Sequence, residues 1–383
     1  MRRPQSLGAL AIAGALALGG CATIPRAPAT AEMQAIAVVP GYDATIRYWS
    51  DGPAESWTAW RMKWLTERSQ TGAQSSFAML AISSGSDKGA FAAGYLNGWS
   101  ASGTRPAFAL VTGVSTGALI APFAFIGETE DDVLRLLYTD VDAKDIFRRS
   151  PLRGVLGGPS FADTRPLARL IARHVTDELV DNIAEAHRNG RRLLVMTTNL
   201  DAQRGTIWDL GEIAASGAPG RVELIRDVLL ASASIPGVFP PVHIQVRSGG
   251  QTFDEMHVDG GTTNSVFVIP DSLLSTQNAE GLATTVNPEM TLLYNGVLSP
   301  RYERVEASAF NVIARALETV IGAGDRRAVS SYQAFARQTK LRLCIEAIPP
   351  DSDPPSADMF DRRDMQRLFA IGREAGVSRQ CRS

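Results

Sequence analysis

The sequence predicts an α/β fold in which helices flank a central, mostly parallel sheet in three layers. Short apolar runs bounded by Gly, Ser, Asn or Pro alternate with helix-like stretches from residue 77 onward. Apolar runs of this kind are typical of buried parallel strands, and strands that alternate with helices form crossover units whose helices cover both faces of the sheet. The chain has 383 residues, 45% of them hydrophobic, which is enough for a sizeable core.

The individual elements follow this alternation. Strands are predicted at 77–82, 108–111, 193–197, 290–294 and 341–345. Helices are predicted at 89–99, 116–125, 131–138, 166–174, 221–230, 302–321 and 364–375. A hairpin is predicted from 242–246 to 252–258, because Ser248-Gly249-Gly250 is a typical turn sequence.

The stretch 30–75 contains strand-like runs at 36–39 and 45–49 and an amphipathic segment at 57–68. Three tryptophans fall on one helical face of that segment: Trp57, Trp60 and Trp64. Tryptophan favours membrane interfaces, so a membrane-facing or lid helix is one interpretation. We favour the other, a helix that packs on the domain.

The first residues have the pattern of a secretory signal. Two arginines precede an apolar run at 7–18, which is too short to span a membrane as a mature helix. Residues 18–21, Leu-Gly-Gly-Cys, resemble the bacterial lipobox, whose cysteine becomes the lipidated N-terminus after cleavage. We therefore expect a signal peptide at 1–20 and lipidation of Cys21. An ordinary signal with a chance cysteine is the alternative.

Lipidation also predicts a location. Acyl chains such as palmitate on Cys21 hold a protein to a membrane without a spanning segment. Residue 22 is Ala rather than Asp, which by resemblance to known lipoproteins favours the outer membrane. The expected location is the bacterial cell envelope, on the outer membrane facing the periplasm. Residues 21–75 are then a tether and N-terminal extension, and 76–383 are the main domain.

Charge and cysteine content exclude several classes of protein. The formal net charge is −2, so the sequence gives no electrostatic case for nucleic-acid binding. We find neither a Cys/His cluster with metal-ligand spacing nor a calcium-loop pattern, and expect no metal and no other cofactor. Besides Cys21, the chain has Cys344 and Cys381, for which a disulfide and two free thiols are both open.

The strongest local motif is a G-x-S-x-G pattern, Gly113-Val114-Ser115-Thr116-Gly117. It follows the predicted strand 108–111 and precedes the predicted helix 116–125, which is the context of a nucleophile elbow. Flanking glycines leave room for a sharp turn, and the helix N-terminus offers free N–H groups to developing negative charge. This context predicts Ser115 as a nucleophile.

A serine nucleophile needs a base, and Asp259 is the candidate. It ends the predicted hairpin and is followed by Gly260 and Gly261. A carboxylate at the end of a strand can be presented at the sheet edge close to Ser115. The alternative is an Asp that caps a turn through its own backbone, as Asp-Gly sequences commonly do.

A third segment lies between the predicted strand 77–82 and helix 89–99. It is a Ser/Gly-rich loop that ends in five candidate oxyanion-hole residues: Gly85, Ser86, Asp87, Lys88 and Gly89. Such a loop directs backbone N–H groups toward an anion, which in acyl transfer is the tetrahedral oxyanion. A phosphate-binding loop or a plain turn is the alternative, although the loop lacks the Gly-Lys-Ser/Thr ending of a nucleotide P-loop.

The order of the three motifs resembles that of the patatin-like phospholipase family. The block at 231–241, Ala-Ser-Ala-Ser-Ile-Pro-Gly-Val-Phe-Pro-Pro, is also similar to one that this family carries before its Asp. The resemblance covers residues 77–264 most clearly. It implies a patatin-like serine hydrolase domain within 76–383, and a phospholipase or lipid esterase whose substrate is a lipid acyl ester.

For the site, the resemblance implies a Ser–Asp dyad without a catalytic histidine. Ser115 matches the nucleophile, Asp259 matches the base, and the loop 85–89 matches the oxyanion hole. The sequence departs from the family at Ser84 and Ser86, where glycines are usual. Backbone N–H groups form such a hole, so serine can substitute, at a cost where the position requires a positive φ.

Two other functions stay open at this point. A Ser–His–Asp hydrolase would use His257 with Asp209 or Asp227 as the acid, although no histidine follows residue 257. An inactive, lipid-anchored binding protein on the same fold is the second alternative, because folds outlive functions. A buried His257 could also tune the pKa of Asp259 from two residues away.

Overall fold

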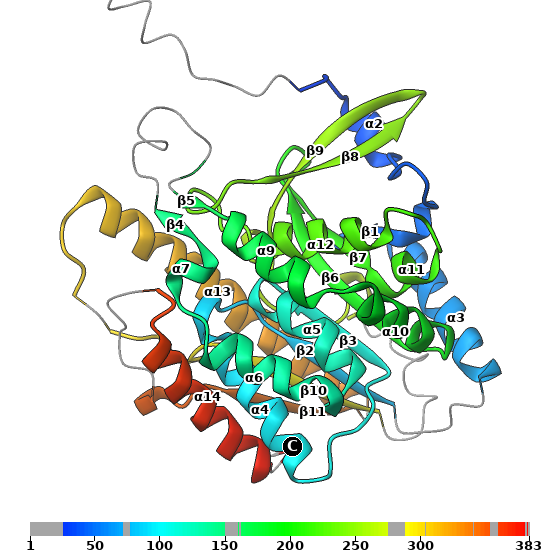
Figure 1. Cartoon of the computed structure of the whole chain (residues 1–383). Coiled ribbons are helices and arrows are strands. Elements are labelled where there is room, and N and C mark those ends of the chain that lie inside the picture. Colours follow the sequence, from blue (N-terminus) through cyan, green and yellow to red (C-terminus); the bar gives the residue numbers. More distant parts are fainter. Residues whose placement is uncertain are drawn as a thin grey trace, which may run out of the picture.

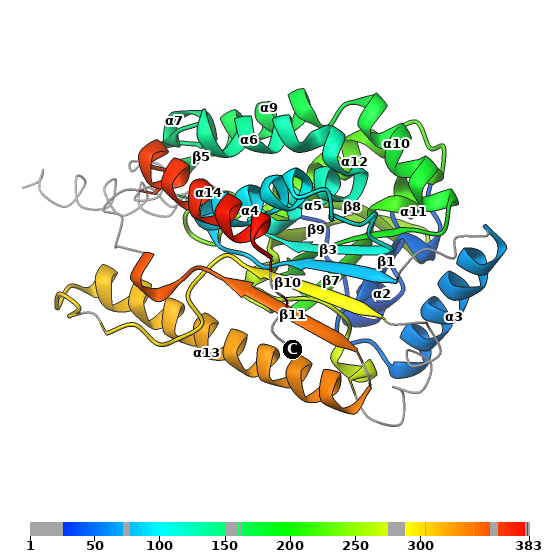
Figure 2. The same ribbon diagram turned by 90° about the horizontal axis from the view of Figure 1, so that it is seen from below.

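The computed structural model describes residues 26–71, 77–149, 160, 162–274, 288–302, 304–339, 341–352, 359–379 and 381. Within these residues, one sheet of nine strands forms the centre of the molecule (Figures 1 and 2). Its strands are β1 (Arg47–Trp49), β2 (Ala78–Ile82), β3 (Leu110–Val114), β6 (Arg192–Asn199), β7 (Arg204–Asp209), β8 (Val242–Ser248), β9 (Gln251–Asp259), β10 (Glu289–Tyr294) and β11 (Arg342–Ala347).

The sheet is mostly parallel, as the sequence predicts. Its main strand order is β1-β7-β6-β3-β2-β10-β11, and each neighbouring pair from β6 to β11 is parallel. Strands β7 and β9 pair with β6 antiparallel, and β8 pairs with β9. The hairpin predicted near 242–258 is therefore confirmed. Arg247 of β8 also forms an isolated antiparallel bridge with Val38, the one paired residue of the strand-like run predicted at 36–39. A second, small sheet pairs β4 (Arg148–Arg149) with β5 (Ala162–Asp163).

Helices cover both faces of the sheet, which confirms the three-layer prediction. Figure 2 shows most helices on one face, with α3 and α13 on the other. The larger layer contains α4 (Gly89–Ala101), α5 (Thr116–Ile126), α6 (Asp131–Thr139), α7 (Ala143–Ile146), α9 (Arg165–His174), α10 (Asp177–Arg188), α11 (Leu210–Ala215), α12 (Arg221–Ser232) and α14 (Arg362–Val377). Helices α3 (Ala54–Gln70) and α13 (Ala309–Gln338) form the opposite layer, and the short α2 (Ala31–Ala35) precedes β1.

Two apolar clusters fill the spaces between these layers. Along β2, Leu80 and Ile82 belong to the cluster beneath the larger helical layer, whereas Met79 and Ala81 belong to the other. This alternation follows from the two-residue period of a strand. Because all residues of β2 are buried, the strand reads as one continuous apolar run in the sequence.

Helix α13 differs from its prediction at 302–321. It begins later, because the Ser308 side chain accepts a hydrogen bond from the Asn311 N–H and caps the helix at that point. It also continues beyond Gly322 and Gly324, since three buried side chains hold its second half against the sheet: Val329, Tyr332 and Phe335. The sequence prediction also lacks β7, α10 and α11.

Residues 26–71 pack against the rest of the domain and contribute to its sheet and core. Strand β1 pairs with β7 in the main sheet, and α3 packs its tryptophans into the core. Trp57 is 1% exposed and Trp64 is 2% exposed, which confirms the packed helix and excludes the membrane-facing interpretation. The segment that the sequence assigns to an extension thus contributes an edge strand and a covering helix.

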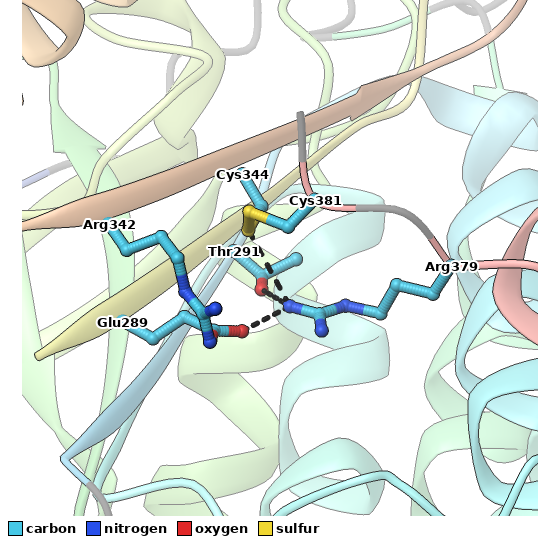
Figure 3. Close-up of a disulfide and its surroundings, with 6 residues drawn as sticks. All are labelled: Glu289, Thr291, Arg342, Cys344, Arg379 and Cys381. Carbon is cyan, nitrogen blue, oxygen red and sulfur yellow. Dashed lines mark hydrogen bonds and ion pairs between the residues drawn. A yellow bond between two sulfur atoms is a disulfide. The ribbon is translucent and has the colours of Figure 1, made fainter. Parts of the chain in front are cut away.

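Helix α14 is fixed against α4 and the sheet edge. A Cβ at Gly94 would overlap the backbone of Phe369, and one at Gly372 would overlap the backbone of Phe91, so the two helices meet backbone to backbone. The end of α14 is joined to β11 by a disulfide between Cys344 and Cys381, with a Cα–Cα distance of 5.1 Å (Figure 3). This result resolves the alternative that the sequence left open.

Two predictions about membranes lie outside these observations. The signal peptide and Cys21 fall outside the described residues. Among the helices that are described, none combines the length and the apolar character needed to cross a bilayer.

Candidate active site

Ser115 lies at the sharp turn between β3 and α5. Its backbone has φ 55° and ψ −121°, outside the ordinary regions for a residue with a side chain. A Cβ at Gly113 would overlap the backbone of Gly117, so the turn is compact enough to require glycine there. The Ser115 N–H donates to Ser232 Oγ at 3.0 Å, which fixes the turn from the neighbouring α12. The sharp turn from strand to helix that the sequence predicts at Ser115 is therefore present.

The sheet places Asp259 directly beside Ser115. The pairing of β3 with β6 ends at Val114 and Met196, and on β6 the next residue, Thr197, pairs with Asp259 of β9. Strand β9 therefore takes the edge of β6 that β3 leaves at the turn. Two residues that are 144 positions apart in sequence thus become neighbours at one point of the sheet.

The two side chains form a hydrogen bond. Ser115 Oγ donates to Asp259 Oδ2 at 2.5 Å. The other carboxylate oxygen, Oδ1, accepts from the Gly261 N–H at 2.7 Å. Ser115 is 5% exposed and Asp259 is 6% exposed, so water reaches only a small part of either residue. The next residue, Gly260, has no room for a side chain, because a Cβ there would lie 2.5 Å from the Met196 carbonyl oxygen.

Burial changes the acidity of this carboxyl group. Loss of solvation raises the pKa of Asp259 from 3.8 to about 6, although the hydrogen bonds from Ser115 and Gly261 act in the opposite direction. A base is most effective when its pKa lies near the working pH. The buried Asp259 is therefore a better base than an aspartate in water.

The third predicted segment lies against this elbow. It forms a 3₁₀ turn, Ser86–Lys88, between β2 and α4. The N–H groups of Lys88 and Gly89 close this turn onto carbonyls within the loop. The first N–H groups of a helical turn have no partner within it, which leaves those near Gly85 and Ser86 available to an anion. The Asp87 N–H, the third predicted donor, instead faces the carboxylate of its own side chain. A Cβ at Gly89 would overlap the Thr116 side chain, so the loop touches the elbow.

Asn295 supports this loop and is absent from the sequence predictions. Its backbone N–H donates to Ser83 Oγ at 2.8 Å, and its side-chain amide donates to the Ser83 carbonyl at 3.0 Å. Its Oδ1 accepts from the Ala92 N–H at 3.2 Å. Gly85 lies so close that a Cβ there would be 2.5 Å from the Asn295 carbonyl oxygen. The sequence signal was a polar residue directly after the buried strand β10.

The two serines that depart from the family pattern have different surroundings. Ser84 lies beside the Asp259 loop, and its Oγ would be 3.5 Å from a Cβ at Gly261. Ser86 adopts φ 55°, a conformation that favours glycine. Its buried hydroxyl makes no hydrogen bond to any residue that the structure describes. Of the two substitutions, Ser86 is the one that carries a backbone cost.

An apolar pocket opens beside Ser115 and Ser86. Aliphatic and aromatic side chains from the larger helical layer line it, among them Leu119, Phe123, Leu170, Ile171, Leu229 and Phe239. Its polar lining residues are few: Ser86, Ser115, Thr116, Tyr138 and His174. The hydroxyls of Tyr138 and Thr116 bond each other at 2.6 Å. This shape suits a hydrocarbon chain whose reactive end lies at Ser115.

His257 lies in a different hydrogen-bond network. It is buried, with Nδ1 2.9 Å from Thr197 Oγ1 and Nε2 3.1 Å from Glu255 Oε2. Both ring nitrogens therefore have partners other than Ser115 and Asp259. The structure does not assemble the triad that would use His257 as the base.

One cluster has the composition of a metal site. His187, Asp209 and Glu212 bring ligand atoms within 4.8 Å of one another, the only such group in the described part of the chain. Arg192 Nε lies 3.8 Å from Asp209, and Lys63 Nζ lies 3.3 Å from Glu212. These two cations already balance the carboxylates, so the cluster is an ion-pair network that links α3, α10 and α11.

The comparison with protein families agrees with this architecture. Residues 80–270 match the family model described as patatin-like phospholipase. Among solved structures, the chain is similar to VipD from Legionella pneumophila, with a TM-score of 0.36 and 11% identity. That match covers 79% of this chain and 66% of VipD, so the chain spans just under two thirds of it. No curated protein sequence matches significantly. Its domain at residues 80–270 makes this chain a member of the patatin-like phospholipase family.

Proposed function

We propose that the protein is a serine acyl hydrolase that cleaves lipid esters through a dyad of Ser115 and Asp259. The observation that carries the proposal is the 2.5 Å hydrogen bond from Ser115 Oγ to Asp259 Oδ2. It occurs in a nearly water-free position at the end of an apolar pocket. Membership of a phospholipase family supports lipid acyl hydrolysis in general.

In the reaction, Asp259 Oδ2 accepts the hydroxyl proton while Ser115 Oγ forms a bond to the ester carbonyl carbon. When the tetrahedral intermediate collapses, the bond to the alcohol breaks and Asp259 returns the proton to that oxygen. Water then attacks the acyl-enzyme, and Asp259 accepts a proton from it. Release of the fatty acid restores the Ser115 hydroxyl. No other titratable group is required, because one carboxylate serves as base and acid in turn.

The negative charge of the intermediate needs donors. The candidate donors are the N–H groups near Gly85 and Ser86, in the loop that contacts Thr116, and those at the N-terminus of α5, which begins at Thr116. Preorganised donors of this type contribute about 3 kcal/mol each to the transition state. Asn295 holds the loop, so the donors do not have to reorganise during the reaction.

The substrate is proposed to divide between two spaces. The apolar pocket takes one acyl chain, since its lining is almost entirely hydrocarbon. A second, more polar groove of about 710 Å³ begins at Gly85 and Lys88 and continues past Arg301 and Arg367. Its lining contains four arginines and one lysine against four acidic residues, Asp87, Glu318, Asp325 and Asp364. The guanidinium groups suit a phosphate or another anionic head group. A phospholipid or lysophospholipid would place its ester between the two spaces.

The proposed location is the outer membrane, facing the periplasm, with Cys21 as the lipid anchor. The lipobox-like segment at 18–21 supports this, and so does the disulfide between Cys344 and Cys381, because disulfides persist in oxidising compartments. Labelled palmitate should be incorporated into the wild-type protein in cells and not into Cys21→Ser. Incorporation into both proteins would contradict Cys21 as the anchor.

The dyad can be tested with a fluorophosphonate probe and a short-chain p-nitrophenyl ester. A chain that starts at residue 22 contains every residue that the structure describes and carries no lipid. Ser115→Ala should lose both labelling and turnover, and Asp259→Asn should lose turnover by about 10³-fold or more. Asp227→Asn is the control, because Asp227 on α12 is another carboxyl with a raised pKa but lies at an exposed position, and it should behave like wild type.

The alternatives predict different results. Activity that survives in Asp259→Asn and is lost in His257→Ala would replace the dyad with a histidine-based mechanism. Folded protein that is neither labelled nor active on any ester would overturn the hydrolase proposal in favour of a binding protein.

A further inference from the structure

The first half of α13 presents an exposed apolar face. Several large aliphatic side chains there lie in water, including Ile313 at 61% exposure, Leu317 at 58% and Val320 at 70%. Spacings of four and three residues put them on one side of the helix. Val312 and Ile321 are also exposed and, being about 180° apart around the helix, lie on the two opposite flanks of this strip. We call these five residues the α13 face.

The exposed residues of the α13 face do not belong to the stripe of α13 that packs on the sheet. The second half of α13 uses Val329, Tyr332 and Phe335 to contact the sheet, whereas the described residues from 311 to 324 include no buried side chain. At 100° per residue, the α13 face is rotated by about a third of a turn from the stripe that contacts the sheet. The exposure of Ile313, Leu317 and Val320 places them away from the sheet, whereas Ile321 lies on the flank that borders the polar groove.

The preceding loop extends the apolar surface. Tyr302 is 94% exposed and Val305 is 38% exposed. In Figures 1 and 2, the N-terminal half of α13, drawn in gold, projects beyond the sheet at the margin of the molecule. Soluble proteins rarely expose large apolar patches, and where they do, the patch commonly marks an interaction site.

The α13 face borders the active site. One side of the same helix, with Arg315, Thr319 and Ile321, lines the polar groove that begins at Gly85 and Lys88 of the oxyanion loop. A ligand in that groove would touch α13 and the catalytic loop at once. The exposed surface therefore continues directly into the space proposed for a lipid head group.

Arginines outnumber acidic residues beside the face, where Glu306 and Glu318 are the exposed carboxylates within the described residues 301–302 and 304–327. Exposed arginines occur in the preceding loop and within the helix, at Arg301, Arg304 and Arg327, and Arg326 lines the groove. Two such faces would bring arginines against arginines, which disfavours a second copy of the chain as the occupant. Apolar side chains bordered by arginines instead fit a membrane surface with anionic head groups.

We propose that the α13 face and the adjacent loop dock the protein on an anionic lipid surface, with the groove mouth against the head groups. This inference rests on the proposed function, since a membrane-borne substrate gives the docking its purpose. Docking would let a lipid move from the bilayer into the groove without exposing its acyl chains to water. It would also orient the catalytic domain on the surface, which the proposed lipid on Cys21 would not do by itself.

The test uses the chain from residue 22 with Ser115→Ala, so that neither the lipid anchor nor hydrolysis affects binding. Sedimentation with phosphatidylglycerol vesicles measures the bound fraction. Leu317→Glu and Val320→Glu should each weaken binding by about tenfold or more, because each replaces an inserted apolar group with a charge. Met62→Glu is the matched control, since Met62 is 54% exposed on α3, away from this surface, and should bind like the parent.

Parallel assays separate this proposal from the proposed function. In the active background, Leu317→Glu should keep turnover of a soluble ester and lose at least tenfold in hydrolysis of vesicle lipid. Equal vesicle binding by Leu317→Glu and its parent would overturn the docking surface, whatever the catalytic result. A dimer that dissociates in Leu317→Glu, with no vesicle binding by the parent, would identify the face as a contact between two copies instead. If the wild-type chain does not hydrolyse a soluble ester but still binds vesicles through this face, only the proposed function is overturned.

Discussion

Ser86 and Ser115 face the same pocket, and both have a backbone φ of 55°. Phe360, with φ 61°, lines that pocket too, so three of the four non-glycine residues with positive φ in the described part of the chain meet there. Each such residue costs about 1 to 3 kcal/mol and persists only where the surrounding structure imposes it. Backbone strain in this protein is therefore concentrated around the proposed reaction centre.

Ser86→Gly should relieve part of this strain. Glycine adopts a positive φ without penalty, so the free energy of unfolding should rise by about 0.5 to 1 kcal/mol while ester turnover stays at or above the wild-type rate. Gln203→Gly is the matched control, because Gln203 has φ 53° at an exposed position outside the pocket and should change stability only. A tenfold loss of turnover in Ser86→Gly would show instead that the Ser86 hydroxyl takes part in the reaction.

The pH dependence of activity should report Asp259. Its carboxyl must be ionised to accept the Ser115 proton, and its pKa is raised to about 6. The value of kcat/KM for a soluble ester should therefore increase about tenfold per pH unit below that point and level off above it. Asp227→Asn should leave the profile unchanged. A profile that stays flat down to pH 4.5 would contradict Asp259 as the base.

The same burial should make Asp259 a cost to stability at neutral pH. In the unfolded chain the carboxyl loses its proton near pH 3.8, whereas in the folded protein it keeps it until about pH 6. The folded state is therefore disfavoured progressively as the pH rises from about 4 to 6, and by about 3 kcal/mol above that range. Asp259→Asn should raise the melting temperature at pH 8 and leave it nearly unchanged at pH 4. An equal shift at both pH values would point to packing rather than ionisation.

Much of the fold and of the site can be predicted from the sequence, because their signals are local. Buried parallel strands such as β2 read as apolar runs, and the turn at Ser115 needs glycines that the motif displays. What the sequence lacks is long-range contact. Asn295 supports Ser83 from 212 residues away, and no local pattern reveals that pairing. The length of α13 was also missed, since burial of Val329 and its neighbours outweighs two glycines.

The disulfide should contribute to stability through its position. Cys344 and Cys381 are 37 residues apart, and closing a loop of that length in the unfolded chain stabilises the folded state by about 3 to 4 kcal/mol. Cys381→Ser should lower the melting temperature by several degrees, and reducing agent should lower that of wild type to a similar value. Arg379 would remain to hold the same segment, through Thr291 Oγ1 at 3.2 Å and Glu289 (Figure 3). Soluble-ester turnover should persist below the new melting temperature, because the bond lies at the edge strand β11.

Asn295 should prove to be a positioning residue for the oxyanion loop. Its amide bonds the Ser83 carbonyl and the Ala92 N–H, so it holds both ends of the segment that contains Gly85. Asn295→Ala leaves those buried groups without partners and allows the loop to shift, which should lower kcat by about 10- to 100-fold with a smaller change in KM. Fluorophosphonate labelling of Ser115 should slow in parallel, since it passes through a similar charged intermediate. Asn199→Ala, which removes another buried Asn that bonds the Ala202 N–H at 3.0 Å, should lose stability and retain kcat. A kcat loss of equal size in both variants would indicate general destabilisation. A selective loss in Asn295→Ala would show that the reaction depends on this contact between β10 and the loop.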